Sequence, residues 1–269
     1  MSKLPGSEAD LLDSVSQLAR RAGVVIMQVY ETDFSVRGKG DGSSVTDADE
    51  RAESAILAGL AALTPHIPVV AEESVAAGRV PDIGLPGDPF WLVDPLDGTQ
   101  EFISRNGKFT VNIALIEGGE PVLGVVYAPA LGRLFAGSRS TGAYVEGQSG
   151  RRTIGCRSVP EAGLTVVASR SHGDAGALDA FLADRKVARL VAAGSSLKLC
   201  LVAIGEADLY PRLGRTMEWD IAAGHAVLAA AGGSVRRLGD GQPLAYGKPA
   251  FDNPHFVAAG LTTTTGSCR

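Results

Sequence analysis

Two acidic residues, Asp94 and Asp97, stand three apart at the end of the apolar run in WLVDPLDGTQEF (residues 91–102). Carboxylates held this close repel each other unless a positive charge lies between them. A bound metal cation would supply that charge. Because Asp, Pro and Gly are also ordinary turn residues, a plain surface turn explains the same letters. Both interpretations stay open at this point.

Two further acids have comparable positions. Glu72 follows the short apolar run IPVVA (67–71), and Asp220 is predicted at the N-cap of the helix that follows MEW. If neighbouring strands are parallel, their carboxyl ends meet at one edge, where ligands of α/β sheets usually bind. Mg²⁺ takes carboxylates and backbone carbonyls, here that of Leu96, together with phosphate and water. Taken singly, Asp220 is better explained as a helix cap and Glu72 as a solvent-exposed acid.

Other reactive residues give weaker signals. The histidines show no metal-ligand spacing and are assigned to structure: His66, His172, His225 and His255. The run 169–172 contains serines and a histidine, but such local neighbours alone seldom form a nucleophile and its base. The glycine-rich stretch 38–42 lacks both the Walker A pattern and the dinucleotide fingerprint. No covalent nucleophile is therefore expected.

Composition limits the classes of function. The net charge is −5 and the pI about 5.4, with no basic cluster long enough to follow a nucleic-acid backbone. A polymeric nucleic-acid partner is not expected, whereas a small phosphorylated ligand is compatible.

The cysteines indicate the compartment: Cys156, Cys200 and Cys268 have neither disulfide nor zinc spacing, which favours a reducing cytoplasm. No apolar run reaches 18 residues, so no transmembrane segment is expected. The sequence leaves open a peripheral contact with the inner membrane, and whether the protein is a monomer or a homodimer.

The first half reads as α+β. Apolar spacing predicts a helix from the cap Ser7 to about Tyr30, and a second helix from near Asp49 to Leu63. Strands are predicted at 67–71 and 89–94, and a hairpin is predicted from FTVNIALIE and PVLGVVYAP around Gly118-Gly119. RLFAGS and GAYVEG continue this meander.

After about residue 158 the pattern alternates between strand and helix. The helix DIAAGHAVLAAAGG is predicted to end at a C-cap formed by Gly232-Gly233. Such alternation favours α/β layering. We therefore predict layered sheets with helices between and outside them, in two domains, 1–157 and 158–269.

Several motifs together carry a resemblance to a known family. EES (72–74), DPLDGT (94–99) and WDIAAGHAVLAAAGG (219–233), preceded by VTDAD (45–49), resemble the magnesium-dependent, lithium-sensitive phosphatases of the inositol monophosphatase superfamily in type, order and separation. The resemblance runs from about residue 8 to 260. The stretches TQEFISRNGKFTVNIAL and GSSLKLCLVAIGEADLYPR are most similar to the CysQ-type 3'(2'),5'-bisphosphate nucleotidases. This implies an αβαβα sandwich, with most metal ligands in the first domain and the substrate wall completed by the second.

The resemblance also implies the roles of the site residues. Two or three Mg²⁺ ions would be held by Glu72, Asp94, the Leu96 carbonyl, Asp97 and Asp220. Thr99, hydrogen-bonded to Asp49, would help Glu72 and a metal to activate the attacking water. Glu73 would assist without contacting the metal itself. The amides of Gly98 and Thr99 would begin a short helix and point at a phosphate oxygen. The substrate-binding residues would be Leu96, Asp97, Gly98, Thr99, Lys198, Arg212 and Asp220.

The expected substrate is adenosine 3',5'-bisphosphate, hydrolysed to AMP and phosphate, with 3'-phosphoadenylyl sulfate as a second candidate; both belong to sulfur metabolism. The segment LYPRLGRTMEWD carries Arg212 and Arg215 and no acid before Glu218, which favours a second phosphate over a neutral polyol. The alternative is that these arginines are solvated surface charges. The main rival is an inositol or sugar-phosphate phosphatase. A non-catalytic regulator is disfavoured because Thr99 and Asp49 are both present.

Overall fold

The computed structural model describes residues 7–38, 40, 44–168 and 175–261. Its helices are α1 (Glu8–Tyr30), α2 (Asp47–Leu63), α3 (Glu72–Ala76), α4 (Thr99–Ile103), η1 (Pro129–Leu131), α5 (Ala175–Leu182), α6 (Leu197–Ala203) and α7 (Glu218–Ala230). The first strands are β1 (Val36–Gly38), β2 (Ser44–Thr46), β3 (Val69–Ala71), β4 (Phe90–Asp97), β5 (Thr110–Glu117), β6 (Glu120–Ala128), β7 (Arg133–Ser138), β8 (Gly142–Gly147) and β9 (Gly150–Ile154). The remaining strands are β10 (Leu164–Ala168), β11 (Val187–Ala192), β12 (Leu209–Arg212), β13 (Ser234–Arg237) and β14 (Phe256–Ala259).

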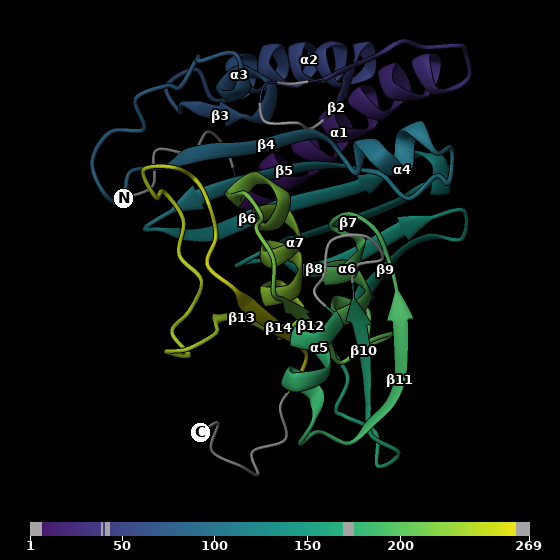
Figure 1. The fold of residues 1–269 in the computed structure, drawn as a ribbon. Coiled ribbons are helices and arrows are strands. Elements are labelled where there is room, and N and C mark those ends of the chain that lie inside the picture. Colours follow the sequence, from purple (N-terminus) through teal and green to yellow (C-terminus); the bar gives the residue numbers. More distant parts are fainter. Residues whose placement is uncertain (1–6, 39, 41–43, 169–174, 262–269) are drawn as a thin grey trace.

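A seven-stranded sheet in the order β3-β4-β5-β6-β7-β8-β9 forms the larger layer (Figure 1). Only β3 and β4 are parallel, and the other neighbours are antiparallel. The predicted hairpin between β5 and β6 is confirmed. Its Gly118 and Gly119 both have positive φ, as a two-residue turn of type I′ requires.

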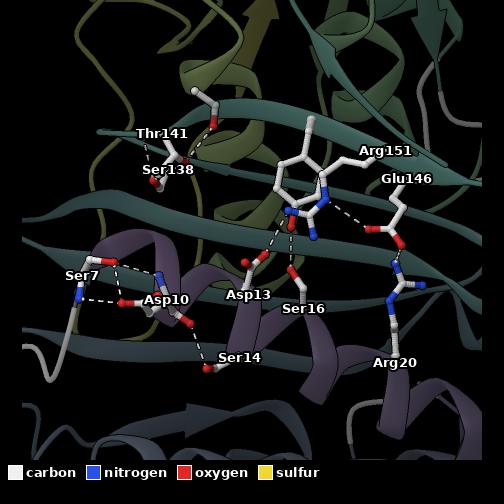
Figure 2. Close-up of polar contacts among 12 residues, drawn as sticks. Ser7, Asp10, Asp13, Ser14, Ser16, Arg20, Ser138, Thr141, Glu146 and Arg151 are labelled. Atoms are coloured by element: carbon white, nitrogen blue, oxygen red, sulfur yellow. Dashed lines mark hydrogen bonds and ion pairs between the residues drawn. The ribbon is translucent and has the colours of Figure 1, made fainter.

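Helices α1 and α2 cover one face of this sheet and bury a single apolar core against it. The predicted helix from Ser7 to Tyr30 is confirmed as α1. Ser7 and Asp10 form a reciprocal capping box at its start. Polar side chains also tie α1 to the far strands. Figure 2 shows Arg151 on β9 reaching Asp13 on α1 at 3.1 Å and Glu146 on β8 at 3.3 Å. These ion pairs thus tie the first helix to the β8–β9 edge of the sheet.

The second sheet has the order β11-β10-β12-β14-β13, and β11, β10 and β12 are parallel. The chain passes from β10 through α5 to β11, then returns through α6 to β12 on the other side of β10. Right-handed crossovers in opposite directions place α5 and α6 on opposite faces. Because α6 and α7 pack between the two sheets, the layer order is α, β, α, β, α, as predicted.

Helix α7 lies unusually close to the larger sheet. It packs on β4 to β7, and a Cβ atom added to Gly124 on β6 would lie 2.5 Å from the Ala223 carbonyl oxygen of α7. Only glycine permits this approach, since a Cβ at that distance would clash with a main chain. After Ala231, the amide of Gly232 (φ 91°) donates to the Ala229 carbonyl and that of Gly233 to the Leu228 carbonyl, which is the glycine C-cap pattern, so the predicted closure of this helix by Gly232-Gly233 is confirmed. The contact at Gly124 therefore holds the middle of α7 close against β6.

The two sheets separate in sequence between Ile154 and Leu164. Their inner faces nevertheless share one apolar core that includes β4 to β8 from the first half and α6, α7 and β12 to β14 from the second. The division into independently folding domains near residue 157 stays a prediction. No helix among the described residues is both long and apolar enough to cross a membrane.

Candidate functional site

A cavity of about 380 Å³ lies where the ends of β3 and β4 meet the start of α7. It gathers nearly all of the residues singled out in the sequence, from both halves of the chain. Those that line it are Glu72, Asp94, Leu96, Asp97, Gly98, Thr99, Lys198, Arg212 and Asp220. A larger hollow, of about 720 Å³, is lined by residues of α2 and α3, among them Glu53 and Glu73.

Glu72 reaches the cavity from the parallel pair of strands. Ala71 at the end of β3 pairs with Val93 of β4, so Glu72 arrives level with Asp94. The strand predicted before Glu72 is present over Val69–Ala71, and Glu72 itself is the first residue of α3.

Asp94 and Asp97 both line the cavity because β4 contains a bulge. Residues three apart on a regular strand point to opposite faces. Here Asp94 pairs with Asn112 while Asp97 pairs with Thr110, so three steps along β4 match two along β5. The extra residue turns both acids to the same side. Asp94 is 2% exposed, and its Oδ1 accepts the Leu96 amide at 3.0 Å.

One oxygen of Asp97 is held by three donors. Its Oδ2 accepts the Ser196 amide at 2.6 Å, the Asn112 side-chain amide at 3.3 Å and the Thr110 hydroxyl at 3.5 Å. In the part of the chain that the structure describes, Oδ1 accepts no hydrogen bond. The carboxylate is thus fixed in rotation, with one oxygen available to a ligand.

The sequence predicts Asp220 at the N-cap of α7, and this prediction is wrong: Asp220 is the third residue of the helix. Met217 is the cap, and the Asp220 carboxylate accepts the Met217 amide at 2.9 Å. The pKa of Asp220 is raised, first by burial and then by the charges of Asp97 and Glu72. A cation bound next to the Asp220 carboxylate would offset this penalty.

Asp49, on α2, supports the cavity by accepting a hydrogen bond from Thr99. It is 1% exposed, and its Oδ2 accepts the amide and hydroxyl of Thr46 at 2.8 and 2.7 Å. Its Oδ1 accepts the Thr99 hydroxyl at 3.4 Å, and the Leu96 carbonyl is an equally distant acceptor. The predicted contact between Thr99 and Asp49 is therefore present, but it is long. Gly98 has φ 93° and precedes the short helix α4, as expected.

Two basic side chains face these acids. Lys198 is 6% exposed and donates to the Ser195 carbonyl at 2.6 Å. Burial lowers the pKa of Lys198 to about 8, while the negative charge of Asp97 opposes the shift. Arg212 donates to the carbonyls of Gly214 and Arg215 at 3.2 and 2.7 Å, which holds its guanidinium at the cavity wall.

The donor set fits a hard divalent cation, since it contains only carboxylate and carbonyl oxygens. Across the described residues, no three His, Cys, Asp or Glu side chains are close enough to hold one metal ion between them. Mg²⁺ commonly takes one or two carboxylates and completes its shell with water and substrate phosphate. The four acids therefore suit several ions that share ligands.

Some residues that shape the site were missed in the sequence. Ser196 and Asn112 hold Asp97, and Glu53 holds the first turn of α3. A signal existed for two of them: Asn112 is a lone amide in the apolar strand TVNIALIE, and Glu53 lies one helical turn after Asp49. The run 169–172 is outside the described residues.

A layered αβαβα fold whose central cavity joins oxygen ligands to basic side chains is the arrangement of a metal-dependent phosphoester hydrolase. Comparison with known proteins gives the family. The sequence profile of the inositol monophosphatase family matches residues 8–264. The chain therefore belongs to the inositol monophosphatase family, whose enzymes are metal-dependent.

Individual relatives agree with this assignment. The chain is 48% identical over 249 residues to the 3'(2'),5'-bisphosphate nucleotidase CysQ of Escherichia coli K12, which covers 91% of this chain and 98% of the relative. The crystal structure of CysQ from Bacteroides thetaiotaomicron superposes with a TM-score of 0.76 at 36% identity, covering 92% and 97% of the two chains. The IMPase of Thermotoga maritima gives 0.74 at 28% identity, covering 93% and 92%.

Proposed function

We propose that this chain is a Mg²⁺-dependent 3'(2'),5'-bisphosphate nucleotidase that hydrolyses the 3'-phosphate of adenosine 3',5'-bisphosphate to give AMP and phosphate. The carrying observation is that Arg212 and Lys198 line the same cavity as the four acids. The name and 48% identity of the Escherichia coli relative support the same substrate. 3'-Phosphoadenylyl sulfate is the second candidate substrate.

Two or three Mg²⁺ ions would be held by Glu72, Asp94, the Leu96 carbonyl, Asp97 and Asp220. Bound there, Mg²⁺ supplies a lower pKa for the attacking water and neutralises charge on the phosphate oxygens. The negative charge of the four carboxylates is then balanced within the cavity.

Thr99, Asp49 and Glu72 orient the water. Asp49 and the Leu96 carbonyl are both acceptors for the Thr99 hydroxyl proton, so the lone pairs of that hydroxyl remain for a proton of the water. Glu72 lines the same cavity as Thr99 and helps to activate the water. The water oxygen attacks phosphorus in line with the 3' ester oxygen and passes one proton to Glu72. The ester bond breaks, and the leaving 3' oxygen takes up a proton from solvent, so that the products are a 3'-hydroxyl and inorganic phosphate.

The basic wall selects the substrate. A bisphosphorylated nucleotide needs a second anion site, and the planar guanidinium of Arg212 suits a phosphate through paired hydrogen bonds. A neutral polyol would gain little from the same group, which disfavours inositol 1-phosphate.

The free thiols Cys156 and Cys200 are compatible with the cytoplasm as the site of action.

Steady-state phosphate release tests this assignment. We expect kcat/KM for adenosine 3',5'-bisphosphate to exceed that for inositol 1-phosphate by at least about a hundredfold, since recognition of a second phosphate contributes roughly 3 kcal/mol. Equal efficiency on the nucleotide and inositol 1-phosphate would overturn it and favour the inositol phosphatase alternative.

A further inference from the structure

Glu53 is a buried acid to which neither the sequence motifs nor the cavity assigns a role. It lies on α2 and is 3% exposed. Its Oε2 accepts the Glu73 amide at 2.8 Å, and its Oε1 accepts the Ser74 hydroxyl at 2.7 Å. Both oxygens are therefore directed at the first turn of α3 and not into the cavity.

This first turn has no cap of its own. The N-cap residue of α3 is Ala71, which has no side chain able to accept a hydrogen bond. The first amides of a helix have no partner within the helix and need an acceptor from elsewhere. Glu53 supplies that acceptor from α2, and its negative charge is favourable at the positive end of the helix.

The same turn begins with Glu72, which lines the cavity. We propose that Glu53 is a positioning residue that fixes Glu72 as a metal ligand by capping α3 in place of Ala71. The proposal rests on the proposed function, in which Glu72 holds a cation. Helix α2 then supports the site twice, because Asp49 on the same helix contacts Thr99.

Three variants of the full chain separate charge from geometry. Glu53→Gln keeps the shape, because its amide oxygen accepts the Glu73 amide while its NH₂ donates to Ser74. Glu53→Ala removes the cap. Glu53→Asp keeps the charge but withdraws it by one methylene, and it serves if the alanine variant does not fold. Asp208→Asn is the control for loss of a buried negative charge elsewhere. Asp208 is 3% exposed, accepts the Thr165 amide at 2.7 Å and pairs with Arg157, and it does not line the cavity.

Two measurements decide the role without an activity assay. Hydrogen exchange of residues 69–79 in metal-free protein should be faster in Glu53→Ala and Glu53→Asp than in the wild type, and unchanged in Glu53→Gln and Asp208→Asn. Calorimetric titration with Mn²⁺ should show affinity weakened about tenfold or more in the first two variants, as for other residues that orient metal ligands.

The possible results point in different directions. Unchanged exchange at 69–79 or wild-type Mn²⁺ affinity in Glu53→Ala and Glu53→Asp would overturn the positioning role, even if both variants melt earlier. A wild type that binds Mn²⁺ but does not hydrolyse bisphosphate nucleotides would refute the proposed substrate and leave the role of Glu53 supported by its variants. A wild type that binds no Mn²⁺ would refute the metal site, and with it this role for Glu53.

Discussion

The main-chain amide of Ser196 donates a hydrogen bond of 2.6 Å to Asp97, which lies 99 residues earlier in the chain. The hydroxyl of the same serine donates to the main-chain carbonyl of Asp220 at 2.5 Å and accepts the Asn112 amide at 2.9 Å. Ser196 thus joins the ends of β4 and β5 to the start of α7. It sets the spacing between two acids that come from different halves of the molecule.

Ser196→Ala should weaken Mg²⁺ binding. Alanine keeps the hydrogen bond from the main-chain amide to Asp97, but it loses the hydroxyl that hydrogen-bonds to Asp220 and to Asn112. We expect the half-saturating Mg²⁺ concentration for activity to rise about tenfold, with a loss of only about 1–2 kcal/mol in stability. Ser14→Ala, which removes an exposed serine bond on α1, is the control. A normal Mg²⁺ dependence in Ser196→Ala would show that this serine does not set the spacing of the acids.

Asp94→Asn should abolish turnover without unfolding the protein. An amide oxygen carries no net charge with which to hold a cation, and losing one such electrostatic contact costs about a hundredfold or more in rate. Removing a negative charge from a cluster of acids should leave the melting temperature in EDTA unchanged or higher. Asp88→Asn, on the loop before β4, controls for the substitution itself. Retention of more than about a tenth of wild-type turnover at saturating Mg²⁺ would refute the ligand role of Asp94.

Arg212→Ala should act on substrate binding. Its guanidinium lines the cavity wall, and we assign it to the second phosphate and not to the reacting one, so we expect KM for adenosine 3',5'-bisphosphate to rise at least about tenfold while kcat changes little. KM for inositol 1-phosphate should stay within about twofold, because it has no second phosphate. Arg236→Ala, another arginine bonded to a loop carbonyl, is the control. An equal effect on both substrates would argue against a second-phosphate site at Arg212.

His225 should make stability depend on pH. It is buried on α7, where Nδ1 lies 2.9 Å from the Tyr246 hydroxyl, and burial lowers its pKa to about 4. The unfolded chain binds a proton near pH 6.5 and the folded protein does not, so this contribution is complete above pH 6.5 and is lost as pH falls toward 4. Between pH 7.5 and 5 the loss is about 2 kcal/mol.

Urea unfolding in EDTA at both pH values measures this effect. His225→Gln should lose about 2 kcal/mol less than the wild type between pH 7.5 and 5, because glutamine does not titrate. The comparison cancels the contribution of the acidic cluster, which is common to both proteins. Identical pH dependence in the two proteins would mean that His225 is not held neutral by the fold.

Local physical rules made much of the fold predictable. Ser7 and Asp10 lie within one turn of each other, and so do the paired glycines of the β5–β6 hairpin, so sequence spacing alone determines those structures. The acids of the cavity were also found, because each follows a recognisable strand or opens a helix. Spacing alone locates these acids less accurately along their elements: it predicts Asp220 at the cap of α7, whereas the cap is Met217 and Asp220 is the third residue of the helix.

What the sequence did not reveal depends on contacts between distant segments. The bulge that turns Asp94 and Asp97 to one side exists only in the pairing of β4 with β5. The bond from Ser196 to Asp97 spans 99 residues, and Glu53 caps a helix that begins 19 residues later in the chain, at Glu72. No local propensity encodes such partners, because each is selected by how the layers pack.

The most direct test of the central claim is to identify the products formed from adenosine 3',5'-bisphosphate by the wild-type protein. In the presence of Mg²⁺ we predict equal amounts of inorganic phosphate and 5'-AMP, and no reaction in EDTA. Formation of 3'-AMP would contradict the proposed orientation of the nucleotide. No hydrolysis of this substrate under conditions in which inositol 1-phosphate is cleaved would contradict the nucleotidase assignment altogether.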